Sequence, residues 1–193
     1  FPEILQNEYS FLANKYNLQP LEKSIWKFMR MRPSNFPTIR IAQFVALFVK
    51  NQNLFQAIIE VKQLSKLQEL FEVDAHSYFD SHYRFDVPGS KKQRKKLGTS
   101  SIDILLINVV IPVLFNYGKH IADIKVQERS IEFLQAITWE RNSIIKKWKE
   151  LGMPISSAYD SQALIQLKNE DCRNKKCLTC TIGNAILKPA KND

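Results

Sequence analysis

Apolar residues recur at helical spacing along most of this 193-residue chain. One such segment contains four apolar residues at positions expected on one side of a helix: Ile41, Phe44, Val45 and Phe48. Only five residues are glycine and eight are proline, whereas a β-sandwich or barrel needs a tight turn after each short strand. We therefore predict an all-α fold, a compact multi-helix domain of six to eight helices with a C-terminal turn that contains cysteines.

Several helix boundaries can be predicted from the pattern. The apolar spacing runs from Leu54 to Phe71 without Gly or Pro, and a second amphipathic stretch runs from Glu132 to Leu151. Ser100 and Asp103 have the spacing of a capping box, and Gly118 is a candidate end for the helix that follows. Thr38 and Asp160 are further candidate caps.

The most apolar run, Ile104 to Phe115, is too short to predict a membrane span, which needs about twenty residues. It contains Pro112, which removes a helical hydrogen bond to the carbonyl of Asn108 and predicts a kink. No signal peptide is recognisable in residues 1–14, and three cysteines are too few for a disulfide framework in a chain of this length. We expect a cytoplasmic protein that does not contact a membrane.

We predict one helical domain over residues 1–193, with a basic loop at 86–98 and a cysteine segment at 171–187. The first residue is Phe1 and not Met, so we expect a fragment of a longer protein. A missing N-terminal domain of the same protein is then an expected partner.

The net charge of +9 is concentrated in one stretch, SKKQRKK. Five cations lie within six positions: Lys91, Lys92, Arg94, Lys95 and Lys96. Like charges at this density keep a loop open and solvated, and each can neutralise a phosphate of a DNA or RNA backbone. The alternative is a mobile surface loop that binds nothing.

Three arginines flank a connection that contains two prolines, RPSNFPTIR: Arg30, Arg32 and Arg40. Guanidinium groups beside a helix N-terminus suit bidentate contacts to one phosphate. The alternative is that they bond to carbonyls of the preceding helix or to acidic residues within the fold.

All three cysteines fall in the string DCRNKKCLTC, as Cys172, Cys177 and Cys180. Their C-x4-C-x2-C spacing predicts a metal site, either structural zinc or an iron–sulfur cluster, both of which usually take four ligands. The fourth ligand is open between His82, the other two histidines (His76 and His120), a carboxylate such as Asp171, and an exogenous group. The alternative is three free cysteines that act as small apolar side chains.

The string HSYFDSHYRF places aromatic residues beside Arg84. Such residues can stack on exposed bases, or they can cover the core. No nucleophile–base set, acid–base pair or glycine-rich phosphate loop is recognisable, so we predict no catalytic set in this chain.

Several strings together resemble the C-terminal half of an uncharacterised family common in Bacteroidetes, domain of unknown function 2851. They are RMRPSNFPTIRIAQF, SHYRF, IDILLINVVIPVLFNYG, DSQALIQLKNEDC and KKCLTC. The resemblance implies that longer members begin with a region similar to PD-(D/E)XK restriction-endonuclease-like folds, which would hold any nuclease activity. It also implies that this chain is their helical partner domain. Together with the basic strings, it predicts a non-catalytic nucleic-acid-binding or accessory domain with a structural metal site. The alternative is a structural or protein-interaction domain with free cysteines.

Overall fold

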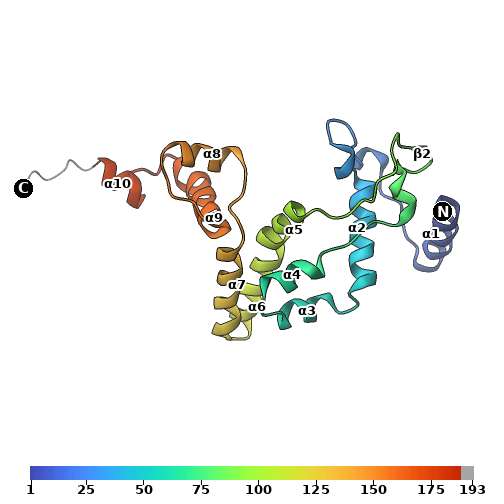
Figure 1. The fold of residues 1–193 in the computed structure, drawn as a ribbon, viewed down its shortest axis with the longest axis horizontal. Coiled ribbons are helices and arrows are strands. Elements are labelled where there is room, and N and C mark those ends of the chain that lie inside the picture. The colour runs from blue at the N-terminus through green and yellow to red at the C-terminus, as the bar shows by residue number, and fades with distance from the viewer. Residues whose placement is uncertain (188–193) are drawn as a thin grey trace, which may run out of the picture. The chain divides into compact units, whose positions relative to one another are not determined.

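The computed structural model describes residues 1–187, most of which are helical. The described residues contain one small two-stranded sheet beside their helices, so the predicted all-α class is confirmed (Figure 1). The chain divides into two compact units. The first comprises Phe1–Val61 and Ser65–Ile102, and the second comprises Lys62–Leu64 and the residues from Asp103 onward.

The first unit contains α-helices, short 3-10 turns and the two strands. Its elements are α1 (Pro2–Tyr16), α2 (Pro37–Lys50), α3 (Leu54–Glu60), nearly all of α4 (Leu64–Leu70), β1 (His82–Arg84), β2 (Val87–Pro88) and the start of α5 (Thr99–Leu105). A core cluster forms where Ile39 of α2 meets Ala75 and Phe79, which are all buried. Tyr78 and Tyr83 pack against this cluster, so the aromatic string covers the core here.

The second unit is built from helices. They are α6 (Ile111–His120), α7 (Ile124–Ala136), α8 (Ser143–Glu150), α9 (Ala158–Gln166) and α10 (Thr181–Leu187). Helices α6 and α7 lie side by side (Figure 1). Ile145, Ile155 and Leu164 form a buried cluster between α8 and α9, against which Trp139 and Trp148 pack.

The irregularity predicted at Pro112 takes the form of a π-helical turn, Leu106–Val110. The Ile111 N–H donates to the carbonyl of Leu106, five residues back. Pro112 has no N–H and cannot donate a helical hydrogen bond. The wider π-helical turn lies directly before this gap in the hydrogen-bond pattern of the helix. Asn108 is exposed, and its side-chain amide donates to the Ile104 carbonyl at 2.9 Å.

With that turn included, Thr99–His120 is one continuous helix that is long and apolar enough to cross a bilayer, judged by length and composition alone. Of its most apolar window, 33% is buried. Core helices of soluble proteins meet the same criterion, so the absence of a membrane contact stays a prediction.

The stretch from Leu54 to Phe71 is not the continuous helix that its spacing suggests. It breaks after Glu60, where Val61 adopts an extended backbone, and α4 begins at Leu64. Ile58 and Leu67 are both buried. Nine residues of one straight helix would place them about 180° apart. The break therefore allows both side chains to be buried.

The amphipathic stretch 132–151 is also interrupted, between α7 and α8. The Ile137 carbonyl accepts a hydrogen bond from the Ala158 N–H at 2.7 Å and not from a following helical turn. Asn142 then begins α8, because its side-chain oxygen accepts hydrogen bonds from two of the first amides of that helix. Periodicity alone does not reveal this local capping.

Gly118 does not end a helix, as its position suggested; it lies inside α6 and is buried. A Cβ atom there would be 2.9 Å from the Val126 Cβ on α7. Gly118 thus permits close packing of α6 and α7 because it has no side chain, and not because it adopts an unusual backbone conformation.

The predicted capping box at Ser100 is wrong as well. The N–H groups of Ser101 and Ile102 donate to the Gly98 carbonyl, and α5 begins at Thr99. Ser100 is therefore already inside the helix.

Candidate nucleic-acid interface

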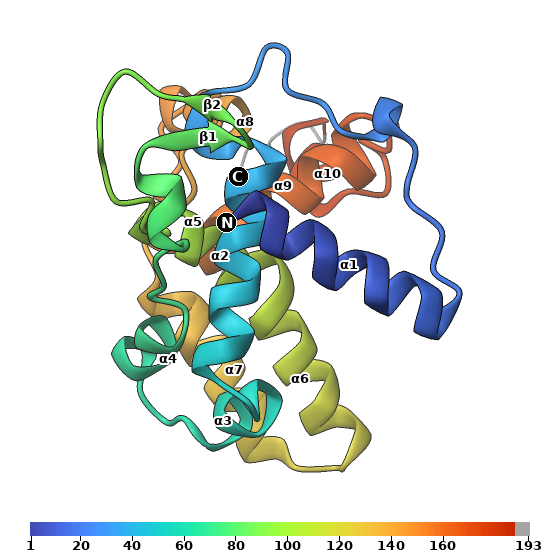
Figure 2. The ribbon, with the colours of Figure 1, turned by 90° about the vertical axis from the view of Figure 1, so that its right-hand side faces the viewer.

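Three strings singled out in the sequence meet at the hairpin formed by β1 and β2. The Thr38 hydroxyl donates to the Tyr83 carbonyl, the Phe36 and Tyr83 rings lie 6.4 Å apart, and the Lys95 ammonium lies 4.2 Å from the Tyr83 ring centroid. Figure 2 shows the two strands beside the first turns of α2. Thr38 is thus not a helix cap; it lies within α2 and binds α2 to β1 through its hydroxyl. Tyr83 contacts both the arginine connection, RPSNFPTIR, and the basic segment, SKKQRKK.

The basic segment is held by backbone hydrogen bonds and is not an open loop along its whole length. The Ala75 N–H donates to the Lys95 carbonyl at 3.1 Å, and the Leu97 N–H donates to the Val73 carbonyl at 2.9 Å. The Gln93 N–H donates to the Asp80 carbonyl at 2.8 Å. These bonds make residues 93–97 an extended segment fixed to residues 73–80.

Three of its five cations are engaged within the first unit. Lys95 is only 6% exposed, and its ammonium donates to the carbonyls of Asp80 and Gln93. Arg94 pairs with Asp74 at 2.5 Å, and Lys96 pairs with Glu72 at 3.1 Å. Lys91 and Lys92 are exposed, and neither forms an ion pair with any described residue.

The arginine connection divides in a similar way. Arg40 hydrogen-bonds to the side chains of Asn35, Gln43 and Ser101, which are neither the helix carbonyls nor the acidic residues of the structural alternative. Arg30 and Arg32 are exposed, and no carboxylate in the described part of the chain pairs with either.

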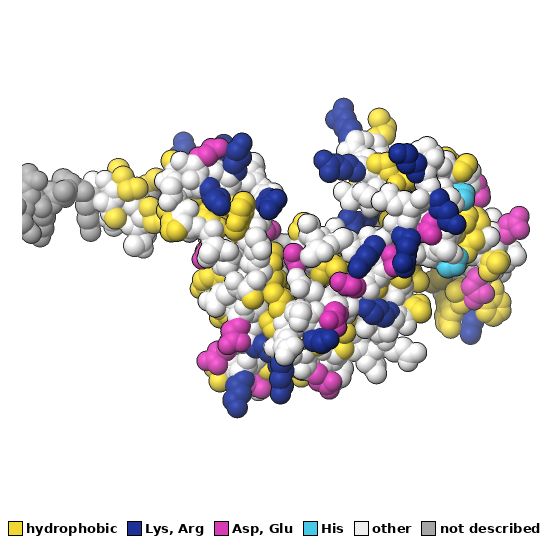
Figure 3. Space-filling view, viewed as in Figure 1, with side chains coloured by type: hydrophobic (Ala, Val, Ile, Leu, Met, Phe, Trp, Pro, Cys, Tyr) yellow, Lys and Arg dark blue, Asp and Glu magenta, His cyan; other side chains and the backbone are white. Residues whose placement is uncertain are grey.

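Arg84, at the end of β1, lies over two aromatic rings, one before the arginine connection and one within it. Its guanidinium carbon is 4.6 Å from the Phe28 ring centroid and 5.3 Å from that of Phe36. Cation–π contact orients the guanidinium without neutralising it, so its charge stays available to an anion. Figure 3 shows Lys and Arg side chains gathered around the hairpin, with some acidic residues among them.

The two histidines of the aromatic string stack on aromatic neighbours. His76 stacks on Phe1 at 4.3 Å and His82 stacks on Tyr78 at 4.2 Å between ring centroids. The His82 Nδ1 lies 2.9 Å from the Tyr78 carbonyl. His82 belongs to the first unit, whereas the cysteines belong to the second.

Cys172 ends a π-helical turn, Leu167–Cys172, and Cys177 and Cys180 lie between that turn and α10. Cys172, Cys177 and Cys180 line one cavity of about 210 Å³, together with Asp171 and Trp148. A Cβ at Gly183 would be 2.5 Å from the Cys177 carbonyl oxygen, so α10 packs directly on the turn. No three His, Cys, Asp or Glu side chains are grouped to hold a metal ion anywhere in residues 1–187.

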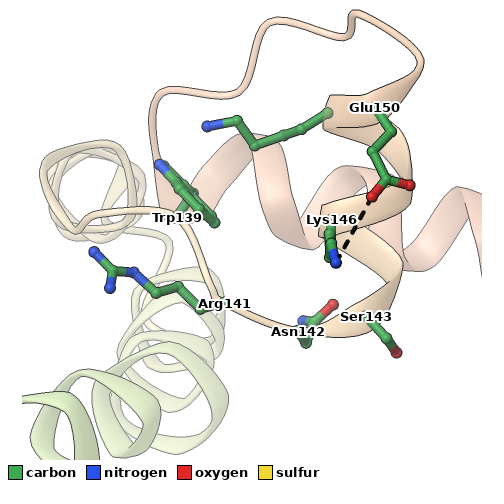
Figure 4. A pocket seen from close by; sticks show the side chains of 7 residues that line it. Trp139, Arg141, Asn142, Ser143, Lys146 and Glu150 are labelled. Carbon is green, nitrogen blue, oxygen red and sulfur yellow. Dashed lines mark ion pairs between the residues drawn. The ribbon is translucent and has the colours of Figure 1, made fainter.

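A further pocket, which the sequence analysis did not predict, opens beside α8 in the second unit. Its volume is about 620 Å³, and its lining includes Trp139, Arg141, Lys146 and Lys149 (Figure 4). The string RNSIIKKWK holds four cations in nine residues and offered a sequence signal. Its cations are less densely spaced than those of SKKQRKK, so it did not stand out by charge.

The comparisons with known proteins give one match. The model of the family DUF2851, described as a protein of unknown function, matches residues 1–143 and so ends before the cysteine segment. No curated protein and no solved structure matches the chain. Because the family match covers more than half of the 193 residues, the chain belongs to the DUF2851 family.

Proposed function

We propose that this chain is a non-catalytic nucleic-acid-binding domain whose first unit contacts the phosphate backbone of DNA or RNA. The observation that supports it is the meeting of two basic strings, RPSNFPTIR and SKKQRKK, at one hairpin, around Tyr83 of the aromatic string. Backbone contacts of this kind bind without sequence preference and need exposed cations that have no internal partner.

Of the eight residues predicted to bind phosphate, four fit that requirement: Arg30, Arg32, Lys91 and Lys92. Of the other four, Arg40 and Lys95 are held by hydrogen bonds within the fold, and Arg94 and Lys96 are exposed but already lie in ion pairs. Arg84 adds a fifth exposed cation without a carboxylate partner, which the sequence placed among the aromatics and not among the phosphate ligands.

Salt dependence of binding distinguishes these two groups. On duplex DNA each neutralised phosphate contributes a slope of about −0.9 to log K against log salt, so these five cations predict a slope of about −4.5, and all nine residues together predict about −8. Five contacts correspond to a loss of roughly 500-fold in affinity between 50 and 200 mM salt. The measurement is fluorescence anisotropy of a labelled duplex and a labelled single strand over that range.

Variants then assign the slope to residues. Replacing both Lys91 and Lys92 with Gln should make the slope less negative by about 2. Lys66→Gln is the matched control, since Lys66 is an exposed lysine of the same unit that already pairs with Glu69. A flat salt response, or no binding at low salt, overturns the proposal and leaves the structural or protein-interaction alternative.

The resemblance to longer proteins with a nuclease-like N-terminal region supports a place for this domain in such a protein. There the reaction would belong to the other region, and this chain would hold the nucleic acid. The exposed cations at the hairpin suit that role because they give affinity and no chemistry.

The metal site is the second part of the proposal. The three cysteines and Asp171 line one cavity, and thiolates with one carboxylate are a donor set that suits zinc. Since the described side chains are not already grouped to hold an ion, binding would require the three thiols to move toward one another. Elemental analysis after anaerobic purification, with a visible spectrum for iron–sulfur absorbance, tests it. Absence of stoichiometric zinc or iron overturns it and leaves three free cysteines.

A further inference from the structure

The pocket beside α8 combines an aromatic wall with several cations. Its lining consists of Trp139, Arg141, Asn142, Ser143, Lys146, Lys149 and Glu150. All seven belong to the second unit, and they come from α8 and the segment that precedes it. Figure 4 shows the indole of Trp139 and the side chain of Arg141 on that segment, opposite the helix.

The charge of this lining is positive, with three cations and one carboxylate. The carboxylate, Glu150, lies 3.8 Å from the Lys146 ammonium, and the two side chains are 61% and 79% exposed. An exposed pair of this length contributes little and is readily displaced. Neither Arg141 nor Lys149 forms an ion pair with any residue that the structure describes.

Trp139 positions these two cations. The Lys149 ammonium lies 4.0 Å from the centroid of the Trp139 ring, and the Arg141 guanidinium carbon lies 5.8 Å from it. Trp139 is itself fixed, because it packs against the core cluster that contains Ile145. A cation–π contact restricts a flexible side chain but leaves its full charge, so both cations are preorganised for an anion.

Two backbone amides at the start of α8 are already hydrogen-bonded within the protein and do not contribute to anion binding. The Asn142 side-chain oxygen accepts hydrogen bonds from the Ile144 and Ile145 N–H groups at 3.0 Å each. Recognition therefore depends on the side chains of Arg141, Lys146 and Lys149.

We propose that this pocket binds the phosphate of a nucleotide, either free or within a single strand. Lysine and arginine recognise phosphate by charge and hydrogen bonding, and the apolar surface beside them accommodates a sugar or base. A volume of about 620 Å³ lies within the roughly 300–1,000 Å³ range of small-molecule sites. The proposal goes beyond the proposed function because it concerns other residues in the other unit.

Calorimetric titration of the full chain with ATP, and separately with a short oligothymidylate, tests this proposal. Lys149→Gln and Arg141→Gln should each weaken binding about tenfold, since each removes a charge-assisted contact. Lys147→Gln is the matched control, because Lys147 is an exposed lysine of the same helix that does not line the pocket. Circular dichroism of each variant verifies that the helices are intact.

The outcomes separate the sources of the phosphate and the two proposals. Binding of ATP that Lys149→Gln weakens indicates a free nucleotide, and binding of the oligonucleotide alone that Lys149→Gln weakens indicates a strand; both support the site. Binding that neither pocket variant weakens overturns it. The Lys91→Gln, Lys92→Gln double variant should leave ATP binding unchanged, even if hairpin binding fails altogether. No binding of either probe at low salt, or an equal loss in Lys147→Gln, overturns the proposal.

Discussion

The Lys95 ammonium lies 4.2 Å from the Tyr83 ring centroid and donates to the carbonyls of Asp80 and Gln93. A lysine from the most densely charged string of the chain is thereby among its buried residues, 6% exposed. Its carbonyl also accepts a hydrogen bond from the Gln43 side chain of α2 at 2.9 Å. Lys95 is a structural residue of the hairpin.

We expect Lys95→Met to destabilise the protein by about 1–3 kcal/mol, because the stem is retained while two carbonyls lose their donor. Urea denaturation followed by circular dichroism measures the free energy of unfolding. Lys91→Met, an exposed change in the same string, should alter it by less than about 0.5 kcal/mol. Equal effects of the two variants would show that Lys95 has no structural role.

Gly118→Ala should destabilise by about 1–3 kcal/mol, since the added methyl would be 2.9 Å from the Val126 Cβ and would force α6 and α7 apart. Thermal or urea denaturation measures this change. Gly98→Ala is the control, because a Cβ at Gly98 meets no atom within 4 Å. A stabilising Gly118→Ala would contradict close packing of these helices.

Hydrogen bonds from the backbone and side chain of Ser156, with those from Ser157, hold the pKa of Asp160 below its ordinary value of 3.8. The resulting stabilisation is complete above that ordinary value and is lost as the pH falls through the lower pKa of the folded state. Asp160→Ala should therefore destabilise by about 0.5–1 kcal/mol at neutral pH, as expected for a helix cap. The difference should vanish at low pH, where the wild-type carboxyl is protonated.

Melting temperatures of wild type and Asp160→Ala across the acid range test that pH dependence. Glu132→Ala, an exposed change on α7, should give no comparable gap at neutral pH. A gap that stayed constant down to the lowest pH would mean that ionisation of Asp160 is irrelevant to α9.

Gly183→Ala should loosen α10 from the cysteine turn, because its Cβ would lie 2.5 Å from the Cys177 carbonyl oxygen and 2.8 Å from the Cys177 Cα. We expect amide hydrogen exchange in Thr181–Leu187 to accelerate by about tenfold or more. Exchange in α8 of the same variant serves as the internal reference. Unchanged exchange in α10 would show that the turn accommodates the methyl.

Periodicity predicted the helical class because the apolar spacing of a helix is a local property of the sequence. It missed the breaks near Val61 and Ile137, because those depend on where buried side chains must point and on a hydrogen bond from Ala158. The sequence also suggested Asp160 as a helix cap. In the structure Ser157 is the cap, and Asp160 completes the capping box three residues later.

For the candidate nucleic-acid interface, the sequence predicted which cations are present but not how they are placed or paired. Charge density identifies SKKQRKK, but it does not reveal that Lys95 is buried or that Arg94 and Lys96 have carboxylate partners about twenty residues earlier in the sequence. The pocket at Trp139 was missed for a related reason. Its cations come from one helix and the segment before it, and only the fold brings Arg141 and Lys149 to one aromatic ring.

The backbone pairing of residues 93–97 has a consequence for proteolysis. Trypsin cleaves after Lys and Arg, and proteases cut most readily where an exposed segment can be pulled into an extended form. The bonds after Lys91 and Lys92 meet that condition, whereas those after Lys95 and Lys96 are fixed to Val73 and Ala75 by hydrogen bonds. A brief digestion should therefore nick the native chain before Gln93, while cuts after Lys95 or Lys96 should appear only as this unit unfolds.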